Sequence, residues 1–160
     1  MDLILWRHAE AVDQADEDLG VDLARALTPK GHKQAARMAE WLNRVLPDSA
    51  RVLVSPALRC QQTAQALQRK FQTREELGPR GGPAELLRVA GWPNKRAPVL
   101  VVGHQPTLGQ VAAALMVGQD DAGAAPSWAV RKGAVWWLRR RDREGGHEVV
   151  LMTVRAADRL

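Results

Sequence analysis

Two adjacent side chains that are costly to bury, Arg7 and His8, directly follow the short apolar run LILW near the start of the chain. The same pattern, an apolar run followed by polar or charged side chains, occurs twice more along the chain. Ser55 and Arg59 follow a second apolar run, RVLV, and His104 follows a third, VLVVG. Gathered together, two guanidinium groups and two imidazoles would form a strongly electropositive pocket.

Such a pocket suits a dianionic phosphoryl group. Arginine forks bind phosphate oxygens bidentately, and a helix that starts after Ser55 would add its positive end. Histidine supplies a neutral nitrogen lone pair near pH 7. The set contains no carboxylate and no cysteine. These residues therefore predict a phosphate site with a histidine nucleophile.

Alternating strand-like and helix-like segments are expected to position these side chains, which is the pattern of an α/β domain. We expect strands over residues 2–6, 51–54 and 98–102, the last of them inside a parallel sheet because it is continuously apolar. The carboxyl ends of neighbouring parallel strands lie at one edge, where ligands bind. The polar residues that follow each strand would meet there if the strands are neighbours.

Helices are expected between and after these strands. Thr28 and Ser55 each precede a proline and are interpreted as N-caps, Thr107 is interpreted as a third, and residues 84–89 form a short helix. Apolar residues at helical spacing predict one buried face for each of the first two helices. They are Ala35, Met38, Ala39, Leu42 and Leu46 in the first, and Cys60, Ala64, Leu67 and Phe71 in the second.

The remaining segments are interpreted as loops and a hairpin. Residues 13–20 are polar and acidic, and residues 78–83 are rich in glycine and proline, so both are expected to be loops. Residues 127–138 and 147–155 are expected to be strands joined at residues 144–146 (EGG). No internal repeat or long linker divides residues 1–160, which are expected to form a single domain.

Composition sets the broad class. A chain of 160 residues with 46% hydrophobic content suits one globular domain. No signal peptide is visible and no apolar stretch is long enough for a bilayer, so we expect a cytoplasmic protein without membrane contact. Cys60 is the only cysteine, which excludes an intrachain disulfide and a thiolate metal cluster. The net charge of +5 suits phosphorylated or acidic partners as well as nucleic acid.

Four segments resemble, in order, the motifs of the histidine phosphatase (phosphoglycerate mutase-like) superfamily. Residues 7–10 (RHAE) resemble its RHG signature, residues 27–35 (LTPKGHKQA) its LT-x-x-G-x-x-QA segment, residues 55–64 (SPALRCQQTA) its S-x-x-x-R-x-x-QTA segment, and residues 102–106 (VGHQP) its second histidine. The short length makes the chain most similar to the SixA-type phosphohistidine phosphatases. The resemblance implies a three-layer α/β/α sandwich with a mostly parallel central sheet.

The resemblance also implies a role for each matching residue. His8 would be the nucleophile that becomes transiently phosphorylated. Arg7, Arg59 and His104 would bind the phosphoryl oxygens and stabilise the transition state. Water would then attack phospho-His8 and release inorganic phosphate. Neither a metal nor another cofactor is implied.

Two departures from the family pattern matter. Ala9 replaces the signature glycine, so the backbone there must avoid conformations that only glycine adopts easily. Larger relatives also carry a catalytic glutamate after a leucine, where residues 77–82 (LGPRGG) have no carboxylate; Glu76 and Glu85 flank this stretch.

The missing acid bears on the substrate. An alcohol leaving group benefits from a general acid by about 10²–10⁴-fold, whereas imidazole, with a pKa of roughly 6.5, leaves with little help. This favours phosphohistidine, carried by the phosphotransfer domain of a phosphorelay protein.

Two other functions stay open at this point. A phosphomonoesterase or mutase acting on a small metabolite would need Glu76 or Glu85 to reach the pocket. A non-enzymatic basic module would bind phosphate or nucleic acid through residues 139–143 (RRRDR). A charged run beside a hairpin turn is usually a solvated face, so nucleic acid is not the expected partner.

Overall fold

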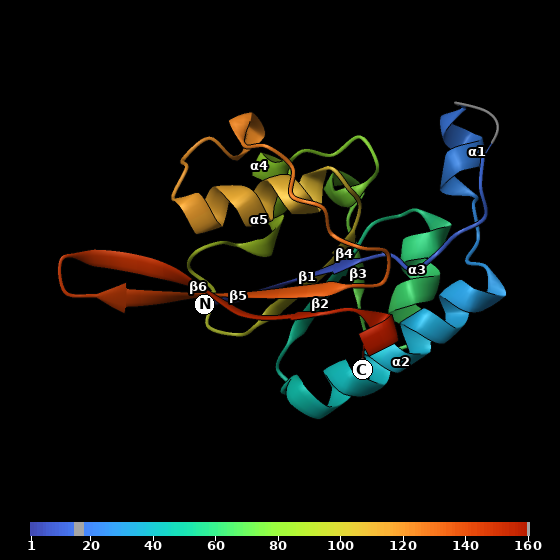
Figure 1. Ribbon diagram of the computed structural model, residues 1–160, viewed down its shortest axis with the longest axis horizontal. Coiled ribbons are helices and arrows are strands. Elements are labelled where there is room, and N and C mark those ends of the chain that lie inside the picture. Colours follow the sequence, from blue (N-terminus) through green and yellow to red (C-terminus); the bar gives the residue numbers. More distant parts are fainter. Residues whose placement is uncertain (15–17, 160) are drawn as a thin grey trace.

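A six-stranded sheet forms the centre of the computed structural model, which describes residues 1–14 and 18–159 (Figure 1). Its strand order is β3-β2-β4-β1-β5-β6. The strands are β1 (Asp2–Arg7), β2 (Arg51–Val54), β3 (Gln72–Thr73), β4 (Val99–Gly103), β5 (Val135–Arg143) and β6 (Gly146–Arg155). The three strands expected from apolar runs are confirmed to within one residue.

The topology places three strand ends side by side. β4 lies between β2 and β1, and pairs in parallel with both. β5 and β6 extend the sheet antiparallel beyond β1. The carboxyl ends of β2, β4 and β1 therefore share one edge, as the sequence predicted for neighbouring parallel strands.

Helices cover both faces of the sheet (Figure 1). Ile4 and Trp6 of β1 contact the core beneath α2 (Pro29–Val45) and α3 (Leu58–Gln65), whereas Leu3 and Leu5 point to the opposite face. That face packs against α4 (Pro83–Ala90) and α5 (Thr107–Val117). The predicted three-layer α/β/α sandwich is confirmed. None of the helices in residues 1–14 and 18–159 is long and apolar enough to span a bilayer.

Two of the three expected helix caps are wrong. Thr28 does cap α2, accepting a hydrogen bond from the Gly31 amide. Ser55 does not cap α3, which begins only at Leu58, because its hydroxyl is held by His104 instead. Thr107 lies inside α5 and donates to the carbonyl of Gly81. Each hydroxyl makes a tertiary hydrogen bond, and Ser55 Oγ accepts from the Ala57 amide at 3.2 Å in the turn before α3. The second helix also ends at Gln65, before its two last expected face residues.

The tail strand begins later than expected. β5 starts at Val135, and residues 127–134 are not a strand. This segment instead crosses the sheet edge beside His8. The Gly133 amide donates to the carbonyls of Arg7 and His8, at 3.1 and 3.0 Å, with Gly133 at a φ of 73° that favours glycine. The hairpin of β5 and β6 is confirmed.

A short helix occupies the end of the expected acidic loop. α1 (Leu19–Leu23) is capped by the Asp18 side chain, which accepts from the Val21 amide. The loop expected over residues 13–20 therefore stops early, and its residues 15–17 lie outside the described part of the chain. Three single-turn helices complete the fold: η1 (Glu75–Leu77), η2 (Ala122–Ala124) and η3 (Ala157–Arg159).

Candidate active site

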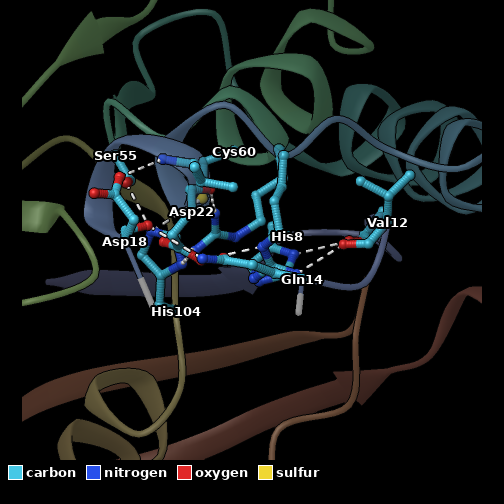
Figure 2. A network of polar contacts seen from close by, with 12 residues as sticks. His8, Val12, Gln14, Asp18, Asp22, Ser55, Cys60 and His104 are labelled. Carbon is cyan, nitrogen blue, oxygen red and sulfur yellow. Dashed lines mark hydrogen bonds and ion pairs between the residues drawn. The ribbon is translucent and has the colours of Figure 1, made fainter. Parts of the chain in front are cut away.

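The strand ends bring the two predicted histidines together. His8 lies one residue beyond β1, and His104 one residue beyond β4. Their ring centroids are 5.4 Å apart, and each residue is only 6% exposed. Arg59, from the first turn of α3, is 3% exposed and contacts His104. Figure 2 shows His8, Asp22, Ser55 and His104 gathered in one polar network.

His8 has a defined tautomer. Its Nδ1 lies 2.8 Å from the carbonyl oxygen of Ala9, and a carbonyl can only accept, so Nδ1 carries the proton. Burial, together with the charges of Arg59 and Arg7, lowers the pKa of His8 from 6.5 to about 3. The imidazole is therefore neutral near pH 7, with the lone pair on Nε2.

Ala9 sits in a backbone conformation open to any residue. Among the residues that the structure describes, Gln68 is the one non-glycine residue with positive φ. The Ala9 amide donates to Thr63 Oγ1 at 3.0 Å, and that hydroxyl donates to the carbonyl of Arg59 at 2.7 Å. The segment that follows His8 is thus tied to α3 without needing a glycine.

His104 is fixed by partners on both ring nitrogens. Nη2 of Arg59 lies 3.3 Å from His104 Nδ1 and can only donate, so Nδ1 accepts and Nε2 donates to Ser55 Oγ at 2.7 Å. Burial lowers the pKa of His104 to about 3, and Arg59 and His8 add to the shift. Cys60 is fully buried, as predicted, and burial raises the pKa of its thiol to about 12.

A carboxylate belongs to this network, contrary to the set inferred from the sequence. Asp22 of α1 accepts from Arg59 twice, through its backbone oxygen at 2.7 Å from Nη1 and through Oδ2 at 3.0 Å from Nη2. Arg25 holds the other carboxylate oxygen at 3.1 Å. The spacing of Asp22 and Arg25 suits a helical ion pair, but it lies at the end of an acidic segment without helical periodicity.

Arg7 contacts the backbone of the segment that precedes β5. Its Nη1 donates to the carbonyl of Val130 at 2.8 Å. The Nε atoms of Arg7 and Arg59 are both buried without a hydrogen-bond partner among the described residues. Arg51 and Arg140 each also have a buried nitrogen without a partner. An unpaired arginine nitrogen is therefore not enough to indicate an anion site; at Arg7 and Arg59 it does so because two imidazoles lie beside them.

The two carboxylates considered as general acids differ in position. Glu76 lines a small cavity with His104, but it accepts hydrogen bonds from Arg74 at 2.9 Å and Arg88 at 3.2 Å. The hydrogen bond from Arg74 is the main reason that the pKa of Glu76 is lowered to about 2. Glu76 is therefore ionised at neutral pH and has no proton to donate. Glu85 is exposed on α4.

The arrangement is chemically suited to phosphoryl transfer. A neutral imidazole with an unprotonated Nε2 lies beside a second imidazole and two arginines, at a buried edge where charge interactions are strong. No cluster of three or more His, Cys, Asp or Glu that could hold a metal ion occurs in residues 1–14 and 18–159.

Known proteins share both sequence and fold with this chain. The model of the histidine phosphatase superfamily (branch 1) matches residues 3–80. The phosphohistidine phosphatase SixA of Escherichia coli is 32% identical over 127 residues, covering 74% of this chain and 76% of the relative. A SixA homolog of Haemophilus influenzae is 32% identical over 134 residues, covering 72% and 77%. The structure of the protein histidine phosphatase SixA complexed with tungstate superposes with a TM-score of 0.72 at 27% identity, covering 99% of this chain and 98% of that one. The chain therefore belongs to branch 1 of the histidine phosphatase superfamily and is a phosphatase.

Proposed function

We propose that the protein removes the phosphoryl group from a phosphohistidine of a phosphorelay protein, through a phospho-His8 intermediate. The observation that carries this proposal is the hydrogen bond from His8 Nδ1 to Ala9, because it leaves the lone pair on Nε2 beside Arg59. Arg7, Arg59 and His104 would bind the phosphoryl oxygens. A phosphotransfer domain is the proposed partner, and such a partner would place the enzyme in the cytoplasm.

In the first step, His8 Nε2 attacks the phosphorus of the substrate. A bond from Nε2 to phosphorus forms while the bond from phosphorus to the substrate imidazole breaks, and that imidazole recovers a proton from solvent. The positive charges of Arg7 and Arg59 offset the negative charge on the transferring oxygens. Burial keeps His8 neutral, so the nucleophile needs no separate base near pH 7.

In the second step, water attacks phospho-His8. A bond from the water oxygen to phosphorus forms, the bond to Nε2 breaks, and inorganic phosphate leaves. His8 returns to its starting tautomer because the Ala9 carbonyl holds the proton on Nδ1 throughout. The same arginines serve both steps, since each transfers the same phosphoryl group.

The proposed substrate follows from the leaving group. Glu76 is ionised and Glu85 is exposed, so neither is placed to protonate an alkoxide as it departs. Imidazole, with a pKa of roughly 6.5, departs without such help. The SixA relatives, named phosphohistidine phosphatases, support the same choice. A sugar phosphate or phosphoserine would be a poorer substrate here.

The test compares two substrates and one variant. The wild-type protein and His8→Ala are incubated with a phosphohistidine-bearing phosphotransfer domain and, separately, with p-nitrophenyl phosphate. We expect faster turnover of the phosphohistidine substrate, and a loss of about 10³-fold or more in His8→Ala. Acid-labile label on wild-type protein after rapid quenching would reveal phospho-His8.

Each contrary result has a distinct meaning. Equal or faster turnover of p-nitrophenyl phosphate would overturn the phosphohistidine assignment and favour a phosphomonoesterase. Full activity in His8→Ala would overturn the nucleophile. His147→Ala is the matched control, because His147 is an exposed histidine at the far end of the hairpin.

A further inference from the structure

We propose that Asp22 positions Arg59, so that the phosphoryl group binds the guanidinium edge formed by Nε and its neighbouring terminal nitrogen. This inference rests on the proposed function, because it assigns a phosphoryl group to Arg59. Asp22 does not touch the substrate in this proposal. It acts through the arginine, from the short helix α1.

Asp22 takes one edge of the guanidinium. A guanidinium donates along two edges, one formed by both terminal nitrogens and the other by Nε with one terminal nitrogen. Nη1 donates to the Asp22 carbonyl at 2.7 Å, and Nη2 to Asp22 Oδ2 at 3.0 Å. A single residue therefore occupies the end of the arginine with its backbone and its side chain together.

The second edge lies beside His104 and is only partly used. Nε of Arg59 is buried without a hydrogen-bond partner among the residues described, although a buried donor is costly to leave unpaired. Nη2 also reaches within 3.3 Å of His104 Nδ1. An anion between the two histidines would pair side-on with Nε and would take over the Nη2 hydrogen that now makes the long contact with His104 Nδ1. Phosphoryl binding would then not require Asp22 to leave.

Polar contacts tie α1 to the site. The helix contains no fully buried residue, and the Asp22–Arg59 pair and Arg25 connect it to the buried network. Arg25 donates to Asp22 Oδ1 and to the carbonyl of Val12, at 3.1 and 2.9 Å. Arg59 has a side chain that is 4% exposed, against 21% for Asp22. The carboxylate therefore lies between solvent and the buried guanidinium, where it fixes orientation without filling the anion position.

Loss of Asp22 should impair the chemical step. Without Oδ2, the backbone carbonyl of residue 22 holds Nη1 alone, so the guanidinium can turn about that single hydrogen bond and no longer presents Nε to the transferring oxygens. Misplacement of a positioning group by about 1 Å can cost about 10²-fold in rate. We therefore expect Asp22→Ala to lower kcat by about 10²-fold, with a smaller change in KM.

The conservative variant separates positioning from simple support. Asp22→Asn keeps the backbone carbonyl and one side-chain acceptor for Arg59, so it should recover much of the lost kcat. Asp158→Asn is the matched control, because it also removes a carboxylate that pairs with an arginine, Arg131 at 3.0 Å, at an exposed site. This control should leave kcat unchanged. Circular dichroism and thermal unfolding verify that each variant folds.

A double-variant cycle tests whether Asp22 works through Arg59. In the Arg59→Ala background, adding Asp22→Ala should cause no further loss of kcat. An equal loss in both backgrounds, or an unchanged kcat in Asp22→Ala alone, would overturn the inference. So would a faster Asp22→Ala enzyme that inorganic phosphate inhibits more strongly, since Asp22 would then compete with the anion. Failure of the proposed function shows itself separately, as an inactive wild type or an active His8→Ala.

Discussion

Burial controls the protonation of the two site histidines at the scale of single residues. His8 and His104 lie between strand ends where little solvent reaches them, and each is surrounded by arginine charge. Both effects act against the imidazolium form. A free histidine would be partly protonated at pH 6, whereas these two stay neutral. The same lowering of the two pKa values also makes folding depend on pH.

The free energy of unfolding should therefore fall as the pH is lowered from 7 to 5. The folded pKa of each histidine, about 3, lies below the ordinary value of 6.5. Between these two values the unfolded chain binds a proton at each histidine and the folded chain does not. Stability is complete above pH 6.5 and is lost between that value and about pH 3. At pH 5 the expected loss is about 2 kcal/mol for each histidine. Urea unfolding in phosphate-free buffer at both pH values measures it.

A control distinguishes these histidines from the remaining two. His32 and His147 are exposed, and the variant His32→Gln/His147→Gln should show the same loss as the wild type. In His8→Gln the difference between the two pH values should shrink by about half, since His104 alone would then contribute. Equal stability of the wild-type protein at pH 7 and pH 5 would contradict the assigned protonation states.

Residue types reveal the cationic part of the site but not its anionic part. His8, Arg59 and His104 each follow an apolar run, and their motif spacing is distinctive enough to be read directly. Asp22 has no such context, because it sits in a five-residue helix without a buried face. Asp22 joins the site only through its tertiary contact with Arg59, and the local spacing of residues does not predict that contact.

At the scale of elements, the first turn of α2 supports the segment that follows His8. The Glu10 carbonyl accepts from the Thr28 amide at 3.0 Å, and Gly31 packs directly against the same backbone. A Cβ atom on Gly31 would lie 1.9 Å from that carbonyl oxygen. The glycine thus permits a close approach between α2 and the residues just after His8 and Ala9.

Gly31→Ala should consequently damage both stability and activity. Helix propensity alone would predict a gain of about 1 kcal/mol, because alanine is the better helix former. Overpacking against backbone should outweigh it, costing about 1–3 kcal/mol, and the displaced segment should lower kcat. Gly146→Ala is the control, because nothing lies within 4 Å of its added Cβ and its φ is not positive. A stabilised, fully active Gly31→Ala would contradict this packing argument.

Strands are easier to predict here than caps and edges. The runs that became β1, β2 and β4 are continuously apolar, and a parallel sheet buried on both faces requires that pattern. Ser55 looked like an N-cap because serine before proline commonly is one. Its hydroxyl instead holds His104, a partner 49 positions away in the chain. Residues 127–134 are equally strand-like in composition, yet their hydrogen bonds go to the ends of β1 and to α5.

The whole molecule separates its chemistry from its basic surface. The histidines lie at the carboxyl edge of the parallel strands, near α1 and α3, while the hairpin of β5 and β6 projects from the opposite end (Figure 1). Three of the four arginines in residues 139–143 are paired: Arg139 with Asp2 at 2.7 Å, Arg143 with Glu148 at 2.6 Å, and Arg140 with Asp142 at 3.3 Å. Pairing of this kind is typical of a solvated face rather than of a phosphate-binding surface.

Removing charge from the hairpin should therefore leave catalysis unchanged. In Arg141→Ser/Arg143→Ser, kcat/KM for the phosphohistidine substrate should stay within about twofold of wild type, because exposed substitutions far from a site usually have small effects. Arg59→Ala provides the contrast, since it also removes positive charge but next to His104. The two variants are compared at low and high salt, together with retention on duplex DNA. Tight, salt-sensitive retention that the hairpin variant abolishes, combined with a loss of turnover, would show that the basic surface takes part in function.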